Sequence, residues 1–182
     1  FFSKKAFEDL KSDKEKGSIR AVLRRVTGAQ MVSNFRPVTA SALYKLFCDE
    51  NDTVWDMSSG WGGRLLGSIK AKVNYIGTDP NTKTMKGLKE MAKTFGNKAQ
   101  SYELLTMGSE DYKPKKNSLD FAFTSPPYFD TERYSNEKTQ SFLKFTNIES
   151  WKDKFLRKTI DNVYRGLKQN KFMALNVADV KN

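Results

Sequence analysis

Short apolar runs alternate with amphipathic stretches along most of this chain. The runs rich in β-branched and aromatic residues predict strands at residues 53–57, 73–77, 102–107, 119–124 and 172–177. Apolar positions at helical spacing predict helices between them, at residues 64–71, 82–95 and 148–167. Because strands alternate with helices, we expect an α/β, Rossmann-like fold. Its mostly parallel sheet should have the strand order 3-2-1-4-5, right-handed crossovers and flanking helices.

The chain ahead of the first strand has a different pattern. Residues 1–34 are charge-rich with a weak apolar stripe, and they predict a helical extension of a core that spans residues 35–182 within one domain. Residues 34–37 are expected to be extended, since the residue before a proline avoids the α region. Thr39 is expected to cap a helix that ends near Asp49. The residues expected to face inward from this helix are Ala42, Leu43, Leu46 and Phe47.

The amino-acid composition favours a polyanionic partner and excludes several kinds of active site. The formal net charge is +11, from 32 Lys+Arg against 21 Asp+Glu, and such a surplus favours a polyanion over a generic basic surface. Without histidine and with one cysteine, Cys48, the chain lacks the side chains of a zinc site and of Ser-His or Cys-His hydrolases. No apolar run is long enough to span a membrane and no signal peptide is visible, so we expect a cytoplasmic protein.

A glycine-rich turn follows the first predicted strand. Gly60 and Gly62 allow tight turning and close approach of a ligand, and the helix that begins there offers free N–H groups. Asp56, at the strand end, suits an ammonium or hydroxyl partner, and Ser58 lies within the turn. A nicotinamide motif would need a third glycine where Leu65 stands, and no P-loop string occurs in the sequence. The pattern favours a nucleoside cofactor without a pyrophosphate over an ordinary strand-to-helix turn.

Acidic residues follow the second and third predicted strands. Asp79 lies at the end of the second strand, roughly 20 residues beyond the glycine turn, where an acid can hold ribose hydroxyls. A helix cap is the alternative role for Asp79. After the third strand, Glu110 or Asp111 can accept a hydrogen bond from an adenine amino group, with a solvated acid as the alternative.

The fourth predicted strand leads into the sequence Ser125–Pro126–Pro127–Tyr128. Two adjacent prolines fix φ and remove two backbone donors, which makes a stiff loop with outward carbonyls and a fixed aromatic ring. In the expected strand order the first and fourth strands are neighbours, and ligands bind outside the carboxyl ends of the strands at that point. The glycine turn and this loop should therefore face each other across a crevice, unless the loop is only a surface turn.

These two loops together suit transfer of a methyl group to an aromatic amine. Such an amine is a poor nucleophile because its lone pair is delocalised, and acceptors for its N–H groups help it to become tetrahedral. Ser125 Oγ and the Pro126 carbonyl are candidate acceptors, and Tyr128 can stack on the base. A sulfonium methyl donor needs no metal and no strong general base, which agrees with the lack of histidine. Positioning and electrostatics would carry most of the catalysis.

The motifs resemble those of the DNA amino-methyltransferases over about residues 35–179. The four-residue loop at 125–128 is similar to the family's catalytic loop. The cofactor loop of the family is matched at Asp56, Gly60 and Gly62. The resemblance therefore covers most of the chain, and its catalytic loop is the more specific of the two motifs.

Other positions extend the resemblance, and two depart from it. Asp79 matches the family's ribose-binding acid, and the segment from Phe35 to Pro37 is similar to the motif that contacts the methionine part of the cofactor. Met57–Ser58 stands where the family usually has Pro-Phe, and residues 169–171 stand where it often has Gly-Gly. The family's last two strands and a target-recognition region are absent from this sequence.

The resemblance implies a class I methyltransferase fold, S-adenosylmethionine as cofactor and DNA as substrate. The methyl group would pass to a flipped-out cytosine (N4) or adenine (N6), and serine in the loop slightly favours cytosine. Residues 130–134 would touch the flipped base or flanking phosphates. A bacterial or phage restriction-modification setting is a family expectation. The expected catalytic residues are Ser125, Pro126, Pro127 and Tyr128, and the expected cofactor-binding residues are Phe35, Asp56, Ser58, Gly60, Gly62, Asp79 and Glu110.

Two other functions stay open at this point. One is an RNA or protein amide methyltransferase with the same loop chemistry, although Asn in the first loop position would fit the protein enzymes better. The other is a non-catalytic DNA-binding subunit that keeps the fold. In either case the fifth strand would be an exposed edge with unpaired backbone groups, which proteins usually avoid. We therefore expect a partner, or a C-terminal continuation, to cover that edge.

Overall fold

The computed structural model describes residues 34–129 and 133–177. The predicted N-terminal helical extension, except for Asn34, lies outside the described residues, as do residues 130–132 of the segment expected beside the flipped base. No helix in the described ranges is both long and apolar enough to cross a membrane.

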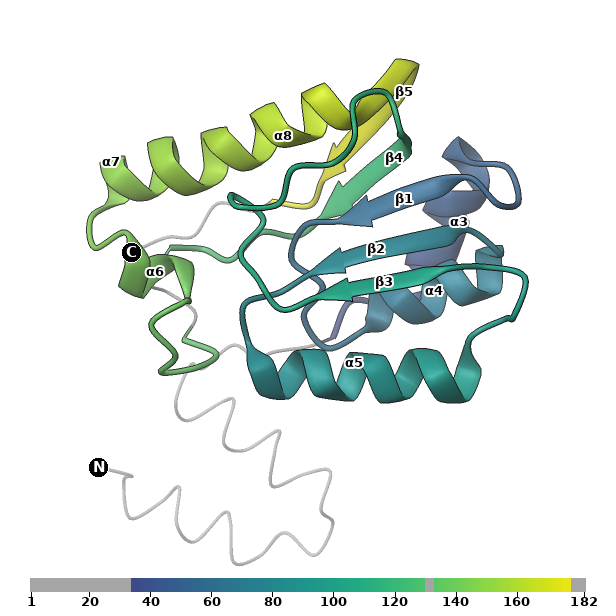
Figure 1. The fold of residues 1–182 in the computed structure, drawn as a ribbon, viewed down its shortest axis with the longest axis horizontal. Helices are drawn as coiled ribbons and strands as arrows, with labels where there is room; N and C mark the ends of the chain where they lie inside the picture. The colour runs from purple at the N-terminus through teal and green to yellow at the C-terminus, as the bar shows by residue number, and fades with distance from the viewer. Residues whose placement is uncertain (1–33, 130–132, 178–182) are drawn as a thin grey trace, which may run out of the picture. The chain divides into compact units, whose positions relative to one another are not determined.

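Five parallel strands form one sheet in the predicted order, β3-β2-β1-β4-β5 (Figure 1). The strands are β1 (Thr53–Asp56), β2 (Asn74–Thr78), β3 (Tyr102–Leu105), β4 (Leu119–Thr124) and β5 (Leu167–Leu175). Because all neighbours are parallel, the carboxyl ends of the strands share one edge of the sheet. The loops that carry the predicted site residues therefore leave the sheet at this carboxyl edge.

Helices cover both faces of the sheet. One face packs against α3 (Pro37–Phe47), α4 (Gly63–Ala71) and α5 (Thr82–Phe95). The other face packs against α8 (Lys158–Gly166), which continues from α7 (Ile148–Trp151) through a π-helical segment, η1 (Lys152–Arg157). A short helix, α6 (Ser141–Lys144), precedes them (Figure 1).

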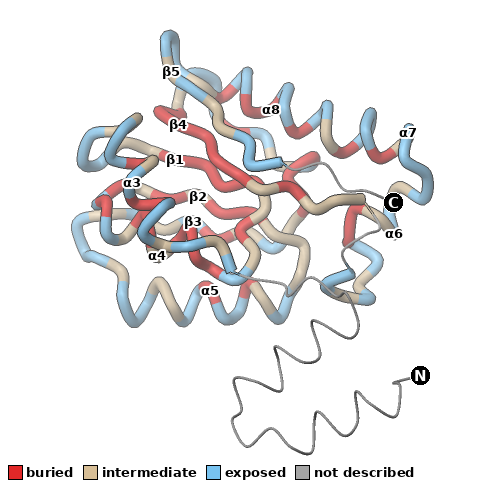
Figure 2. The backbone as a smooth tube through the Cα atoms, turned by 180° about the vertical axis from the view of Figure 1, so that it is seen from behind, coloured by how far each residue is buried: buried red, intermediate tan, exposed pale blue. Residues whose placement is uncertain are grey.

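Alternation along the central strands divides the core in two. Val54 and Phe121 point into the cluster beneath α3, α4 and α5, whereas Trp55 and Ala122 point into the cluster beneath α8. This is the side-chain period of two that a strand imposes. All six residues of β4 are buried, as a strand covered on both faces requires, whereas β5 at the sheet edge is largely half-buried or exposed (Figure 2).

The predicted start of the first described helix is wrong. The helix begins at Pro37 rather than after a Thr39 cap, because proline fits the first helical position, where its missing N–H has no intrahelical acceptor. The inward face agrees with the prediction in part, since Leu43 and Phe47 pack against the core as expected. Ala42 is exposed and Leu46 is 72% exposed, while the buried residues are Ala40, Ser41 and Tyr44.

The helix predicted over 148–167 forms, but its apolar face shifts partway. The π-helical turn in η1 adds a residue to the helix and rotates everything after it. Trp151, Phe155 and Val163 are buried as expected, whereas Thr159 replaces Ile160 on the inner side. The fifth strand also begins earlier than predicted, at Leu167, directly after α8.

Candidate active site at the carboxyl edge

The glycine turn between β1 and α4 needs two left-handed residues. Gly60 has φ +52° and Gly62, which precedes the first residue of α4, has φ +85°. A side chain at Gly62 would also collide with Leu88 and Met91 of α5. The turn is fastened to β2 by a bond from Ser59 N to the Thr78 carbonyl. The glycines thus place the turn close to both α5 and the end of β2.

Beneath the turn, the buried carboxylate of Asp56 is fully used by the protein. It accepts hydrogen bonds from Arg64 Nε at 2.8 Å and from the Tyr75 hydroxyl at 2.7 Å. Ser58 N and Thr124 Oγ1 reach its other oxygen at 3.3 Å and 3.4 Å. Asp56 has no exposed surface, so in this arrangement it supports the turn from below. Its direct contact with a cofactor stays a prediction.

Arg64 and Tyr75 complete this buried network. The Arg64 guanidinium also donates to the Ser58 carbonyl and lies over the ring of Phe35 at 5.6 Å. Burial and the nearby Asp56 charge raise the pKa of Tyr75 well above its ordinary value, so its hydroxyl remains a proton donor to that carboxylate. A buried charge is tolerated only when paired and hydrogen-bonded, and this network meets that condition for Asp56 and Arg64.

Asp79 lies at the end of β2, directly beside the glycine turn. Its carboxylate accepts hydrogen bonds from Gly60 N at 3.0 Å and from Asn81 N at 2.9 Å. Burial raises the pKa of Asp79 to about 6, although the two N–H donors act to lower it. The helix-cap role belongs instead to Asn81, whose side chain accepts from Thr84 N. Asp79 is therefore an acceptor that the fold holds against the turn.

The Ser-Pro-Pro-Tyr loop (Ser125–Tyr128) leaves β4 next to the glycine turn. Its polar atoms are little used, since Ser125 Oγ accepts one long bond, 3.4 Å, from Asn176 Nδ2. Phe129, directly after the loop, has φ +42°, a left-handed conformation that is rare for a bulky residue. Its ring packs on Trp151 of α7 at 6.0 Å. Such local strain clusters at functional sites.

Phe35 lies where the α4 N-terminus meets the end of β4. Its ring packs edge-on against Phe123 at 5.2 Å, and its carbonyl approaches Gly63 so closely that an added Cβ would lie 1.9 Å away. The structure thus brings Phe35, the glycine turn, Asp79 and the Ser-Pro-Pro-Tyr loop to one edge of the sheet. Ser58 belongs to the same group through its bonds to Asp56 and Arg64.

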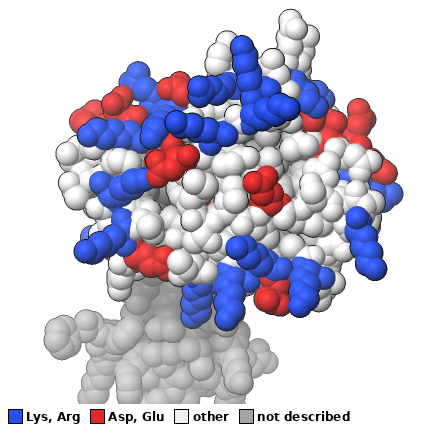
Figure 3. Space-filling view, viewed as in Figure 1, with Lys and Arg blue, Asp and Glu red and all other residues white. Residues whose placement is uncertain are grey.

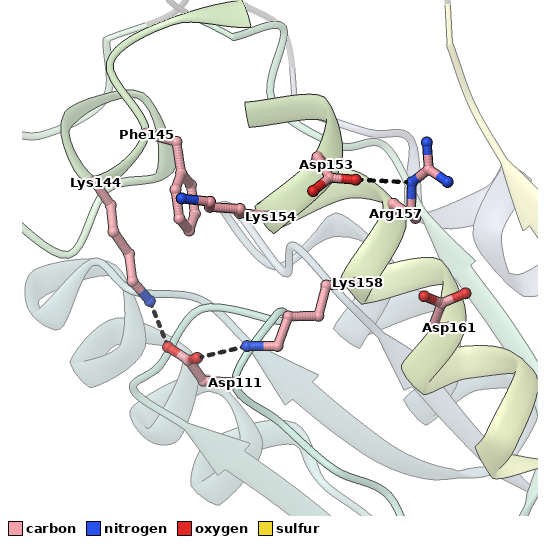
Figure 4. Close-up of a pocket in the computed structure, with 8 residues that line it drawn as sticks. All are labelled: Asp111, Lys144, Phe145, Asp153, Lys154, Arg157, Lys158 and Asp161. Atoms are coloured by element: carbon pink, nitrogen blue, oxygen red, sulfur yellow. Dashed lines mark hydrogen bonds and ion pairs between the residues drawn. The ribbon is translucent and has the colours of Figure 1, made fainter. Parts of the chain in front are cut away.

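Glu110 follows β3, at the far side of the same edge. It is buried, and Lys144 Nζ of α6 contacts its Oε1 at 2.7 Å, whereas its Oε2 has no partner among the described residues. A hollow of about 450 Å³ lies beside it, with Asp111 approached by both Lys144 and Lys158 (Figure 4). The hollow is lined by α6, η1 and α8, so it is separate from the expected crevice between the two loops.

Several residues of this region were not expected from the sequence. Arg64, Tyr75 and Thr124 belong to the buried network, and a polar residue in an apolar pattern gives no signal of its partner. Glu137 is another, since its carboxylate accepts from Thr82 N at 3.2 Å and from Thr82 Oγ1 at 2.8 Å, at the start of α5. Residues after the Ser-Pro-Pro-Tyr loop thus return to the helix that follows Asp79. The two residues are 55 positions apart, so no local sequence pattern predicts this contact.

Comparison with known proteins gives a fold rather than a family. No protein-family model matches the sequence, and no curated protein matches it. Solved structures do match. A Methanococcus maripaludis protein described as an S-adenosyl-L-methionine-dependent methyltransferase aligns with a TM-score of 0.51 and 15% identity. The alignment covers 76% of this chain and 53% of that one.

Two further structures give the same picture. Mycolic acid cyclopropane synthase CmaA1, solved with SAH, has a TM-score of 0.51 and 18% identity over 76% of this chain and 40% of its own. A Galdieria sulphuraria protein described as a sarcosine dimethylglycine methyltransferase has a TM-score of 0.51 and 14% identity, over 96% and 52%. The chain thus spans about half the length of the structures it matches.

The names of these three structures do not mention DNA, so the likeness to the DNA amino-methyltransferases in particular stays a prediction. Strand order, parallel pairing and flanking helices agree with the fold expected from the sequence. The described part of the chain has the Rossmann-like fold of class I methyltransferases.

Proposed function

We propose that this protein transfers a methyl group from S-adenosylmethionine to the exocyclic amino group of a flipped-out DNA base, cytosine at N4 or adenine at N6. The observation that carries the proposal is the parallel pairing of β1 with β4. It sets the glycine turn and the Ser-Pro-Pro-Tyr loop at adjacent strand ends. The bond from Thr124 Oγ1 to Asp56, 3.4 Å long, joins the bases of the two loops.

The residues around the turn fit an adenosine cofactor. Glu110 Oε2 is a buried acceptor with no donor among the described residues, which is what an adenine amino group would supply. Asp79, held at Gly60, offers a carboxylate to ribose hydroxyls. Phe35 lies at the other end of the turn, against Phe123 near the end of β4, where it suits the methionine part. Glu110, Asp79 and the glycine turn follow β3, β2 and β1, and Phe35 lies against β4, the next strand in the sheet.

Bound S-adenosylmethionine would supply an electrophilic methyl group and a neutral thioether leaving group. Ser125 Oγ and the Pro126 carbonyl accept hydrogen bonds from the two N–H groups of the base, so that the amine nitrogen becomes a tetrahedral nucleophile. Tyr128 holds the ring by stacking, a contact worth roughly 1–3 kcal/mol. As the new C–N bond forms, the amine becomes cationic and its proton leaves to solvent. A chain without histidine can therefore catalyse this step by positioning and electrostatics.

The experiment uses the full chain with methyl-labelled S-adenosylmethionine and equal amounts of DNA, RNA and protein as acceptors. We expect label in DNA, and Ser125→Ala should remove most of it. Ser150→Ala is the control and should leave the labelling unchanged, because this serine of α7 has a hydroxyl without a partner among the described residues. Label in RNA or protein would point to the other methyltransferase activities. Cofactor binding without any transfer would favour a non-catalytic DNA-binding subunit.

A further inference from the structure

One face of α5 carries a row of lysines that the described protein leaves uncompensated. This lysine row consists of Lys83, Lys86, Lys89 and Lys93, all exposed, and none forms an ion pair or side-chain hydrogen bond with another described residue. Spacings of three and four residues make successive members neighbours on the helix surface, where like charges repel. Glu90 is the single acid of the helix, and it is not paired with them either.

Several surface cations elsewhere in the described chain are paired with acids. Lys72 pairs with Glu50, Lys152 with Glu149 and Arg157 with Asp153, each at the surface. No member of the lysine row is paired in this way with a described residue, and blue side chains, with a red one among them, gather along the part of the molecule where α5 lies (Figure 3). Unmatched charge of one sign on one helix attracts a ligand of opposite sign and repeating charge.

A glycine within the same helix gives a second, independent observation. Gly87 lies in the interior of α5, is exposed, and has no described atom within 4 Å of where its Cβ would stand. Neither packing nor a turn requires glycine at this position, and a glycine inside a helix lowers its stability. A bare backbone flanked by Lys83 and Lys86 instead leaves room for another chain to approach closely.

The position of α5 connects the lysine row to the candidate active site. The helix begins directly after Asp79, at the carboxyl edge, and runs away from that edge along the sheet (Figure 1). From Lys83 to Lys93 the helix rises about 15 Å. One strand of a nucleic acid rises about 3.4 Å per phosphate, so the row spans roughly four phosphates.

We propose that the lysine row binds the phosphate backbone of nucleic acid beside the active site, with Gly87 as the point of closest approach. The choice of nucleic acid among polyanions rests on the function proposed above. The lysine row would supply affinity and salt dependence without contacting the reacting base, because phosphate contacts position a duplex and carry no sequence information.

The test measures duplex DNA binding by fluorescence anisotropy at several salt concentrations, using the full chain. Lys86→Gln with Lys89→Gln is compared with Lys115→Gln and Lys116→Gln, an exposed pair that precedes β4 at the opposite edge of the sheet. Both pairs remove the same charge, so only location differs. We expect the first pair to lower the slope of log affinity against log salt by about 2 and to weaken binding about tenfold. The second pair should change either quantity much less.

Gly87→Leu provides a variant without a charge change. It should leave thermal unfolding unaltered or raise the midpoint, while weakening DNA binding several-fold. Equal effects of the two lysine pairs, or unchanged binding with Gly87→Leu, would overturn the inference. The inference would also be overturned if Lys86→Gln with Lys89→Gln abolished binding to phosphatidylserine vesicles and left DNA binding intact. Methyl transfer at saturating DNA separates the two proposals, since the lysine row can fail while transfer persists, and transfer can fail while lysine-dependent binding persists.

Discussion

The glycine turn and the Ser-Pro-Pro-Tyr loop are neighbours at the carboxyl edge, but they are held in different ways. The turn is bonded to Asp79 through Gly60 N, to β2 through Ser59 N, and to Arg64, which is itself paired with the buried Asp56. The loop is stiffened by its own prolines, and its serine hydroxyl has a single long bond. The side that would bind a cofactor is thus built into the core, whereas the side that would meet a base keeps its polar groups available.

The largest expected effect is a loss of stability when Arg64, which supports the glycine turn from below, is removed. Arg64→Ala leaves the Asp56 carboxylate buried without its ion pair, and we expect the free energy of unfolding to fall by about 3–5 kcal/mol. Denaturant unfolding measures this change, with Lys70→Ala, an exposed residue of the same helix, as the control. An unfolding free energy within about 1 kcal/mol of the unaltered chain would show that the turn does not depend on this network.

A variant at the side of the turn should affect cofactor binding more than folding. Asp79→Ala removes a charged acceptor for ribose hydroxyls, worth about 1.5–3 kcal/mol, and should raise the cofactor dissociation constant tenfold or more. Calorimetric titration with S-adenosylmethionine measures it. The control is Asp161→Ala, an exposed acid of α8. An unchanged dissociation constant in the Asp79 variant would mean that the ribose lies elsewhere.

Changing the loop should give the opposite pattern. Tyr128→Ala should raise the activation barrier of methyl transfer by about 1–3 kcal/mol, which slows the reaction roughly tenfold to 100-fold. Cofactor affinity and the free energy of unfolding should stay unchanged. Tyr164→Ala removes a tyrosine that is 85% exposed on α8 and should leave the rate intact. If the Tyr128 variant also lost cofactor binding, the separation between the two loops would not hold.

The smallest effect should be a dependence of stability and cofactor affinity on pH, caused by Asp79 beside the glycine turn. The folded-state pKa of Asp79, about 6, lies above its ordinary value of 3.8. Protonation is thus favoured in the folded state, so the contribution of Asp79 to stability should fall as pH rises from about 4 to about 6. An ionised acceptor is needed for ribose, so cofactor affinity should drop about tenfold from pH 7 to pH 5. In Asp79→Asn, stability and cofactor affinity should both lose this dependence on pH. If either kept it, the titrating group would be a residue other than Asp79.

The parts of this fold set by local patterns could be predicted from the sequence. Apolar runs gave the five strands, and topology rules gave their order, which placed Asp79 beside the glycine turn and the Ser-Pro-Pro-Tyr loop next to it. The start of α3 was missed because a proline both ends an extended segment and fits the first helical position. The π-helical turn in η1 has no local signal, and Thr159 rather than Ile160 is buried on the helix that follows it.

The supporting contacts of the site could not be predicted, because each depends on a partner outside the residue's own strand, helix or loop. Arg64 begins the helix predicted over 64–71, and its partner is a buried carboxylate at the end of the preceding strand, eight positions earlier. Glu137 finds its partner, Thr82, 55 residues away. Sequence patterns thus identify groups that could act on a ligand more readily than the groups that hold them in place.

The most direct measurement of the central claim is nucleoside analysis by mass spectrometry. Duplex DNA is incubated with the full chain and S-adenosylmethionine, digested, and compared with a Ser125→Ala sample. The account predicts N4-methylcytosine or N6-methyladenine in the first sample and a large loss of it in the second. A folded protein that binds S-adenosylmethionine and DNA but leaves every amino group of the bases unmethylated would contradict it.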